Sequence, residues 1–530
     1  MMRFLFPLPI LRESSYQNMQ ATVPVGDISH GTSVLLYWNG NKTGASKHKR
    51  NYNLCILKNA PPTTARRFRM SASISPTAFL GSFFHTPRYG EVELLENVLI
   101  EVDARGFITD VVRADAPDYA ARVEHARNAG TLVELAQGTY GLPGFVDMHV
   151  HAPQWPQAGV ALDEPLDVWL QKRTFPLEAR FADLDFARPV YRDLVSRLLS
   201  LGTTTTVYFA SNDLASSIEL ARICAEGGQR ALVGKVVMDD ASANPDFYRD
   251  ASTAQALADT ETLLAEVAQI GAATRQGVFG VVTPRFIPSC TTEGLAGLGR
   301  IAEKTGAYVQ SHCAEGQWEQ SVAPARYGKS DARALYDFGL LREKSVMAHC
   351  TFLSESDGEL FARSGAAVAH CPVSNSYFAN SVCPVRRLRG QGVRMGLATD
   401  ISGGFSPSMY ENMRHAIMVS RMLEEGVDAR VEPEARGAGE PGRITSAEAL
   451  WLATAGGGEA LRLPVGTFER GQAFDMQVID TRVAGADLTG FNVFTAPRDI
   501  IDRIIYLATP ENVRQTWVQG ALVHDRSALR

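Results

Sequence analysis

The chain has 530 residues, of which 45% are hydrophobic and 21% charged, and its formal net charge is −6. This composition is typical of a folded globular protein, and the mild acidity argues against a nucleic-acid surface. No apolar run reaches the roughly 18 residues that a membrane-spanning helix needs, so we expect no membrane partner. The seven cysteines are scattered and form no C-x-x-C pair, which predicts reduced thiols in a cytoplasmic protein.

Residues 1–75 differ from the rest of the chain. Lys and Arg far outnumber Asp and Glu there, and the hydrophobic residues follow no sustained period. We expect a disordered extension or a start that is assigned too early, with an organelle transit peptide as the alternative.

Strand patterns occur on both sides of a long middle segment. Hydrophobic residues alternate at 92–102 and 107–112 around a turn at Arg105-Gly106, and similar patterns recur at 474–479 and 513–518. We therefore expect residues 76–140 and 462–530 to pack together as one small β-sandwich-like domain.

The middle segment, residues 141–461, alternates short apolar strands with amphipathic helices such as 187–201, 254–270, 294–304 and 356–363. The expected strands are 144–149, 203–209, 231–238, 279–283, 308–312, 345–348, 366–370 and 393–398. Eight such units predict an α/β fold of the (β/α)8 TIM-barrel type. A doubly wound open sheet is the competing architecture, but the first strand is not followed by a G-x-G-x-x-G turn.

Polar residues end several of these strands, where barrel enzymes carry their chemistry. His149 and His151 are two residues apart, so in a strand they point to the same face. His312, His349 and Asp400 end three later strands. Imidazole and carboxylate ligands suit zinc, and iron or another divalent metal is also acceptable. The alternative for each histidine alone is a hydrogen-bonded core residue.

His370 ends the seventh strand and is a further histidine in this series. We do not assign it to the metal, because it can equally line the pocket or brace its strand.

Several motifs resemble those of the amidohydrolase superfamily. The first-strand motif is Gly-Leu-Pro-Gly-Phe-Val-Asp-Met-His-Val-His at 141–151, and the segments 310–315, 347–349, 370–375 and 396–400 continue the series in order. Within the superfamily the chain is most similar to the guanine deaminase family, chiefly at Ala152-Pro153-Gln154 and Pro284-Arg285-Phe286. The resemblance covers residues 91–523.

This resemblance implies a ligand set and a set of catalytic residues. One Zn²⁺ per subunit is expected, because the fourth strand ends in Thr283-Pro284-Arg285 and lacks the lysine that bridges two metals in some members. Glu315 would move protons, Asp400 would take the proton of the attacking water, and His349 would lie beside that water. The implied metal ligands are His149, His151, His312 and Asp400. The implied substrate contacts are His151, Gln154, Arg285, Phe286, His312, Glu315 and Asp400.

The activity implied is hydrolytic deamination of guanine to xanthine and ammonia by a cytoplasmic homodimer, with a small purine base as the only partner. The chief alternative is an aminohydrolase for another amino-heterocycle, such as 8-oxoguanine, an adenosine-type compound or a triazine. A catalytically silent scaffold protein on the same fold is a third hypothesis. It is disfavoured because every expected ligand and Glu315 are present.

Overall fold

The computed structural model describes residues 78–439 and 441–529, which fall within one compact unit. The extension expected at residues 1–75 lies outside the described residues. Within the described ranges, no helix combines the length and the apolar character needed to cross a membrane.

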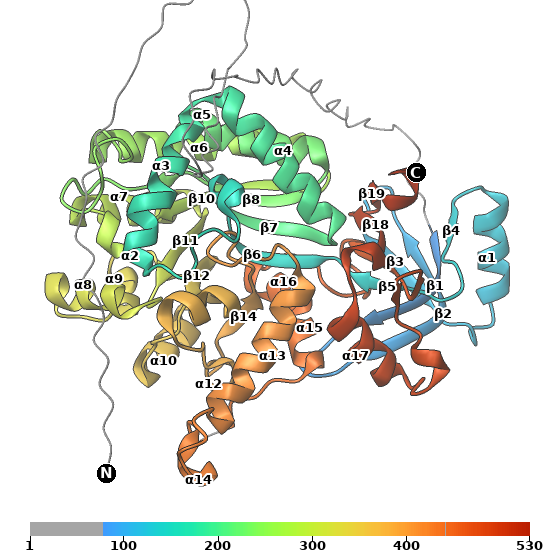
Figure 1. The fold of residues 1–530 in the computed structure, drawn as a ribbon. Helices are drawn as coiled ribbons and strands as arrows, with labels where there is room; N and C mark the ends of the chain where they lie inside the picture. Colours follow the sequence, from blue (N-terminus) through green and yellow to red (C-terminus); the bar gives the residue numbers. More distant parts are fainter. Residues whose placement is uncertain (1–77, 440, 530) are drawn as a thin grey trace, which may run out of the picture. The chain divides into compact units, whose positions relative to one another are not determined.

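A barrel of parallel strands occupies the centre of the described unit (Figure 1). Its strands are, in chain order, β6 (Phe145–His151), β7 (Thr203–Phe209), β8 (Arg230–Gly234), β9 (Val236–Val237), β10 (Val278–Pro284), β11 (Tyr308–Cys313), β12 (Ser345–His349), β13 (Ala367–His370) and β14 (Arg394–Leu397). Nearly every residue in them is buried, because helices cover the outside of the barrel and side chains fill the inside. The expected α/β barrel is confirmed.

Helix α7 (Thr292–Thr305) shows capping at both of its ends. Thr291 accepts a hydrogen bond from Gly294 N at the start of α7, and Gly306 ends that helix with φ of 65°. The larger helices around the barrel are α4 (Leu184–Ser200), α5 (Leu214–Gly227), α6 (Thr253–Ala272), α7 (Thr292–Thr305), α8 (Gln317–Tyr327), α10 (Glu355–Ser364), α13 (Met409–Glu425), α15 (Ser446–Ala453) and α16 (Ala455–Leu461).

One expected strand, 231–238, differs from the structure. It is interrupted at Lys235, which separates β8 from β9, and both pieces pair with β10. The Lys235 side chain is buried and its Nζ lies 2.6 Å from Asp250 Oδ1. A buried ammonium group needs such a partner. The hydrophobic pattern of residues 231–238 did not predict this ion pair, because Asp250 lies outside the strand.

The barrel closes between its first and last strands. Asp400 N donates to His149 O at 2.9 Å, and His151 N donates to Ile401 O at 2.8 Å. Below them, the buried Asp147 carboxylate accepts from Thr399 N at 2.9 Å and from Thr399 Oγ1 at 2.6 Å. These contacts bring the end of β14 against the end of β6.

A second, mixed sheet flanks the barrel and combines strands from both ends of the described chain (Figure 1, right). Phe79 and Phe474 stack in its core with ring centroids 4.0 Å apart. Its strands are β1 (Ala78–His85), β2 (Glu93–Val102), β3 (Ile108–Val112), β4 (Leu132–Glu134), β5 (Thr139–Pro143), β15 (Met476–Asp480), β18 (Val513–Val518) and β19 (Ala521–Asp525). The later segment also carries α17 (Pro497–Leu507), which packs on α13 and α15.

A buried ion pair joins this sheet to the barrel. Arg230, at the start of β8, pairs with Asp475, which precedes β15, and both side chains are at most 3% exposed. Gln519 completes the cluster, since its backbone N–H donates to Asp475 and its side-chain oxygen accepts from Arg230. The charges are therefore fully compensated away from water.

We predict that Asp475→Asn lowers the free energy of unfolding by about 3 kcal/mol, because it leaves the Arg230 charge buried without a counter-ion. Denaturant unfolding measures the change. Glu91→Gln, in an exposed pair with Arg88, is the control and should change it by less than about 1 kcal/mol. Equal effects of the two variants would contradict the prediction.

Candidate functional site

A narrow pocket lies at the carboxyl ends of the barrel strands. It brings together nearly all the residues predicted from the sequence, and His149 lies just beneath it, against Asp400. The lining residues are His151, Gln154, Leu166, Trp169, Leu170, Arg285, Phe286, His312, Glu315, His349, Phe378, Asp400 and Gly403.

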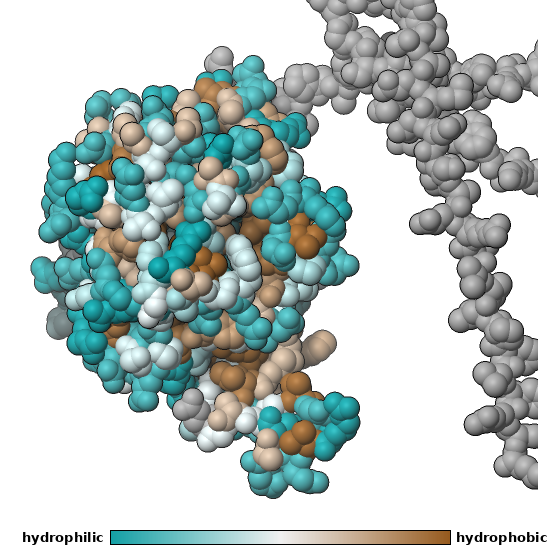
Figure 2. Space-filling view, turned by 90° about the vertical axis from the view of Figure 1, so that its left-hand side faces the viewer, coloured by the Kyte–Doolittle hydropathy of each residue, from teal (hydrophilic) through white to brown (hydrophobic). Residues whose placement is uncertain are grey.

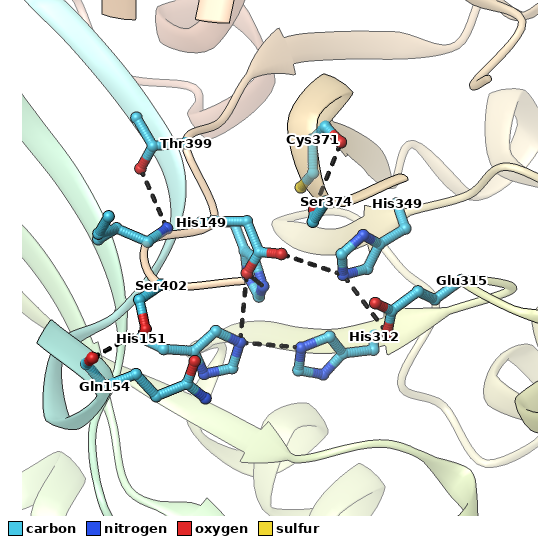
Figure 3. Close-up of polar contacts among 12 residues, drawn as sticks. His149, His151, Gln154, His312, Glu315, His349, Cys371, Ser374, Thr399 and Ser402 are labelled. Carbon is cyan, nitrogen blue, oxygen red and sulfur yellow. Dashed lines mark hydrogen bonds and ion pairs between the residues drawn. The ribbon is translucent and has the colours of Figure 1, made fainter. Parts of the chain in front are cut away.

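His149, His151 and His312 converge at the base of the pocket (Figure 3). Asp400 contacts two of these histidines. His149 Nε2 lies 3.1 Å from Asp400 Oδ1, and His151 Nε2 lies 3.5 Å from the same oxygen. His151 Nε2 and His312 Nε2 are 3.0 Å apart. Three of the four groups come from two strands, β6 and β11, and Asp400 follows β14.

The chemistry of these groups fits a divalent metal. Because a carbonyl can only accept, the 2.6 Å contact of His312 Nδ1 with Arg285 O puts the proton on Nδ1 and leaves a lone pair on Nε2. Burial, followed by the neighbouring cationic groups, holds the pKa of His149, His151 and His312 well below the ordinary range, so the rings are neutral. His149 Nε2 makes no hydrogen bond within the described residues. Neutral imidazole nitrogens and a carboxylate oxygen that lie this close together are suitable ligands for one divalent metal ion.

Glu315 and His349 lie beside this cluster. His349 Nε2 is 3.7 Å from Glu315 Oε2 and 4.0 Å from Asp400 Oδ2. His349 Nδ1 lies 2.9 Å from Asn375 Oδ1, an acceptor, so His349 Nε2 is again the unprotonated nitrogen. Burial, and then the charge of Asp400, raises the pKa of Glu315 to about 8, so its carboxyl group holds a proton at neutral pH in the metal-free protein.

The backbone of Glu315 is held by two polar side chains. Glu315 N donates to Glu319 Oε2 at 2.7 Å, and Thr351 Oγ1 donates to Glu315 O at 2.8 Å. The preceding Ala314 has φ of 52°, in the left-handed region that a residue with a side chain rarely adopts. The contacts that hold this turn fix the direction in which the Glu315 carboxyl group points.

Behind the outer wall of the pocket lies a buried polar group that the sequence did not predict. Glu178, at the end of α3 (Phe175–Glu178), accepts a hydrogen bond from Gln154 Nε2 at 2.7 Å and from Arg285 Nη1 at 2.6 Å. Phe286 follows Arg285 and its ring lies 5.7 Å from that of Trp318. Gln154, Arg285 and Phe286, the three residues expected to contact the base, all line the pocket, and Glu178 holds Gln154 and Arg285 in place.

Sequence reasoning missed Glu178 and the role of Asn375. Glu178 lies in an irregular helical segment without a motif, and only the fold brings it to Arg285. Asn375 belongs to the segment 370–375 that the resemblance singled out, but its contact with His349 depends on the turn after β13. Among the described residues, two overlapping groups could hold a metal, His149 with His151 and His312, and His149 with His349 and Asp400. His370 is buried and belongs to neither group, which agrees with leaving it unassigned.

A parallel (β/α)8 barrel with histidines and an aspartate at its strand ends is the arrangement of the metal-dependent barrel hydrolases. Residues 140–523 match the Amidohydrolase family, and the chain belongs to that family. Guanine deaminase of Homo sapiens is 34% identical over 462 residues, which cover 86% of this chain and 98% of the relative. Guanine deaminase of Dictyostelium discoideum is 34% identical over 455 residues, which cover 83% of this chain and 97% of the relative.

A solved structure supports the same relationship. The guanine deaminase from C. acetobutylicum, whose structure has guanine bound in the active site, aligns with a TM-score of 0.74 and 28% identity. The alignment covers 84% of this chain and 100% of that protein.

Proposed function

We propose that the protein is a guanine deaminase that hydrolyses guanine to xanthine and ammonia. The observation that carries the proposal is the pocket itself, in which the ligand cluster, the carboxyl group of Glu315 and the donor Arg285 face one cavity. Independent support comes from the relatives that are named guanine deaminase, because this chain aligns with nearly the full length of each of them.

The proposed cofactor is one Zn²⁺ per subunit, held by His149, His151, His312 and Asp400. Three neutral imidazoles and one carboxylate suit zinc better than magnesium or calcium, which prefer oxygen ligands. When bound, the metal lowers the pKa of water so that hydroxide is available near neutral pH.

The chain's own residues orient the base and move the protons. Arg285 donates to the guanine carbonyl oxygen, and Phe286 packs against the purine ring. Asp400 takes the proton of the attacking water, while the unprotonated Nε2 of His349 accepts a hydrogen bond from it. Glu315 protonates the ring nitrogen beside C2, and the proton that Asp400 took from the water then passes to the departing amine, which leaves as ammonia. The proton on the new C2 hydroxyl returns to Glu315 as the C2 carbonyl of xanthine forms.

We expect Glu315→Gln to reduce guanine turnover by about 10²- to 10⁴-fold, because the amide cannot supply a proton. Xanthine formation and bound metal are measured together, and the metal content should stay at the wild-type value. Glu293→Gln, at an exposed position in the first turn of α7, is the control. Near-normal turnover in the Glu315→Gln protein would remove Glu315 from the mechanism.

The metal assignment predicts a difference between two buried histidines. His149→Asn should lose most of the bound zinc and nearly all activity, since one of four ligands is removed. His370→Asn changes an equally buried histidine outside the cluster and should keep the metal. Elemental analysis of the purified proteins measures both, and full zinc occupancy in the His149 variant would contradict the ligand set.

We also propose that the enzyme is a cytoplasmic homodimer. The described cysteines are all free and buried, which suits a reducing compartment. The face drawn in Figure 2 is mostly hydrophilic, but hydrophobic residues gather beside the projecting segment that carries α14 (Pro433–Arg436). Four large hydrophobic residues on α13, just after it, and at the end of α17, which packs on α13, are also exposed, and they favour a partner surface on these two helices: Met418, Met422, Val427 and Leu507.

Light scattering after gel filtration should therefore give twice the chain mass for the wild type. Met418→Glu combined with Leu507→Glu should give the mass of one chain, because charges are costly in an apolar interface. A monomeric wild-type protein would contradict the proposed dimer.

A further inference from the structure

Glu178 lies behind the wall of the pocket and does not line it. Its side chain is 1% exposed and lies in the irregular helical segment that follows β6. One carboxylate oxygen, Oε1, accepts from Gln154 Nε2 at 2.7 Å and from Arg285 Nη2 at 3.2 Å, while Oε2 accepts from Arg285 Nη1 at 2.6 Å. One buried carboxylate thus holds both side chains that face the polar edge of the substrate.

The charge of Glu178 determines which way the Gln154 amide points. A carboxylate can only accept hydrogen bonds, so the amide group that faces it must be the NH₂. The amide oxygen is then on the other side of the group, and Gln154 lines the pocket. Gln154 therefore presents an acceptor to the substrate, although the glutamine side chain by itself could present either a donor or an acceptor.

Arg285 is held in the same way. Its Nη1 and Nη2 atoms form a two-point contact with Glu178. The guanidinium carbon also lies 5.0 Å from the centre of the ring of Phe175, which belongs to the same helix as Glu178. Two-point pairing of this kind fixes the plane of a guanidinium as well as its position. The remaining N–H groups of Arg285 are donors at every accessible pH.

We propose that Glu178 is a positioning residue that sets the polarity of the recognition edge, with a donor from Arg285 next to an acceptor from Gln154. That order matches a ring carbonyl beside a ring N–H, as in a 6-oxopurine. It opposes an exocyclic amine beside an unprotonated ring nitrogen, as in a 6-aminopurine, where donors would face donors and acceptors would face acceptors. The inference rests on the proposed function and adds the residue that enforces its substrate class.

Guanine and 2,6-diaminopurine test this directly, because they share the 2-amino group and differ only in the polarity of this edge. The test uses metal-loaded full-length protein and compares the KM for guanine with the inhibition constant of 2,6-diaminopurine. We expect the wild type to favour guanine by at least about a hundredfold. Glu178→Gln, whose new amide lets Gln154 turn either face to the pocket, should reduce that preference at least about tenfold. KM for guanine should rise, while kcat falls less than about threefold, since Glu178 is remote from the reacting carbon.

Two further variants separate positioning from general destabilisation. Asp475→Asn removes the charge from an equally buried Arg–carboxylate pair beyond the other end of the barrel and should leave the preference unchanged. In a Gln154→Ala background, Glu178→Gln should lose most of its effect on the preference, because the side chain through which it acts is absent.

The outcomes separate this inference from the proposed function. A wild-type protein that binds guanine, combined with a preference unchanged within twofold in Glu178→Gln, overturns the role of Glu178 and leaves the proposed function standing. The role of Glu178 is also overturned if Glu178→Gln reduces the preference for guanine as strongly in the Gln154→Ala background as in the wild type. A wild-type protein that neither binds nor deaminates guanine, as judged by calorimetry and xanthine formation, overturns both.

Discussion

The contact between the first and last barrel strands is the constraint on which the site depends. Asp147 and Thr399 are 252 residues apart in the chain, and their side chains meet at 2.6 Å. Because all barrel strands are parallel, this closure sends the ends of β6 and β14 to the same rim and brings Asp400 against His149 and His151. The flanking sheet supports the opposite end of the barrel through the Arg230–Asp475 pair.

Burial then gives these residues their chemical character. The same loss of water that keeps the site histidines neutral raises the pKa of Glu315, so one environment yields both ligand lone pairs and a protonated acid. The outer wall contains a buried cation, since the guanidinium of Arg285 is almost fully removed from water and the carboxylate of Glu178 compensates its charge. Catalytic chemistry and substrate recognition are thus separated into two polar clusters, one at the metal ligands and one around Glu178.

The sequence predicted those features that follow a local period or a fixed spacing. Alternation and length predicted the parallel barrel, and the two-residue spacing of His149 and His151 predicted that both face the same centre. Residues that act through tertiary contacts carried no such signal. Glu178 contacts Arg285 from behind the pocket wall, and Lys235, at which an expected strand is interrupted, is buried against Asp250. The direction of the Gln154 amide could not be predicted from the sequence either, because it depends on the Glu178 carboxylate that the fold places opposite the amide.

The most direct test of the account is ammonia release from purified, zinc-loaded protein supplied with guanine, with 8-oxoguanine, adenine and cytosine in parallel. We predict rapid release from guanine with an equal amount of xanthine, and little release from adenine or cytosine. Release from adenine in preference to guanine would contradict the donor–acceptor order of Arg285 and Gln154, and no release from any base at full zinc occupancy would contradict the proposed function itself.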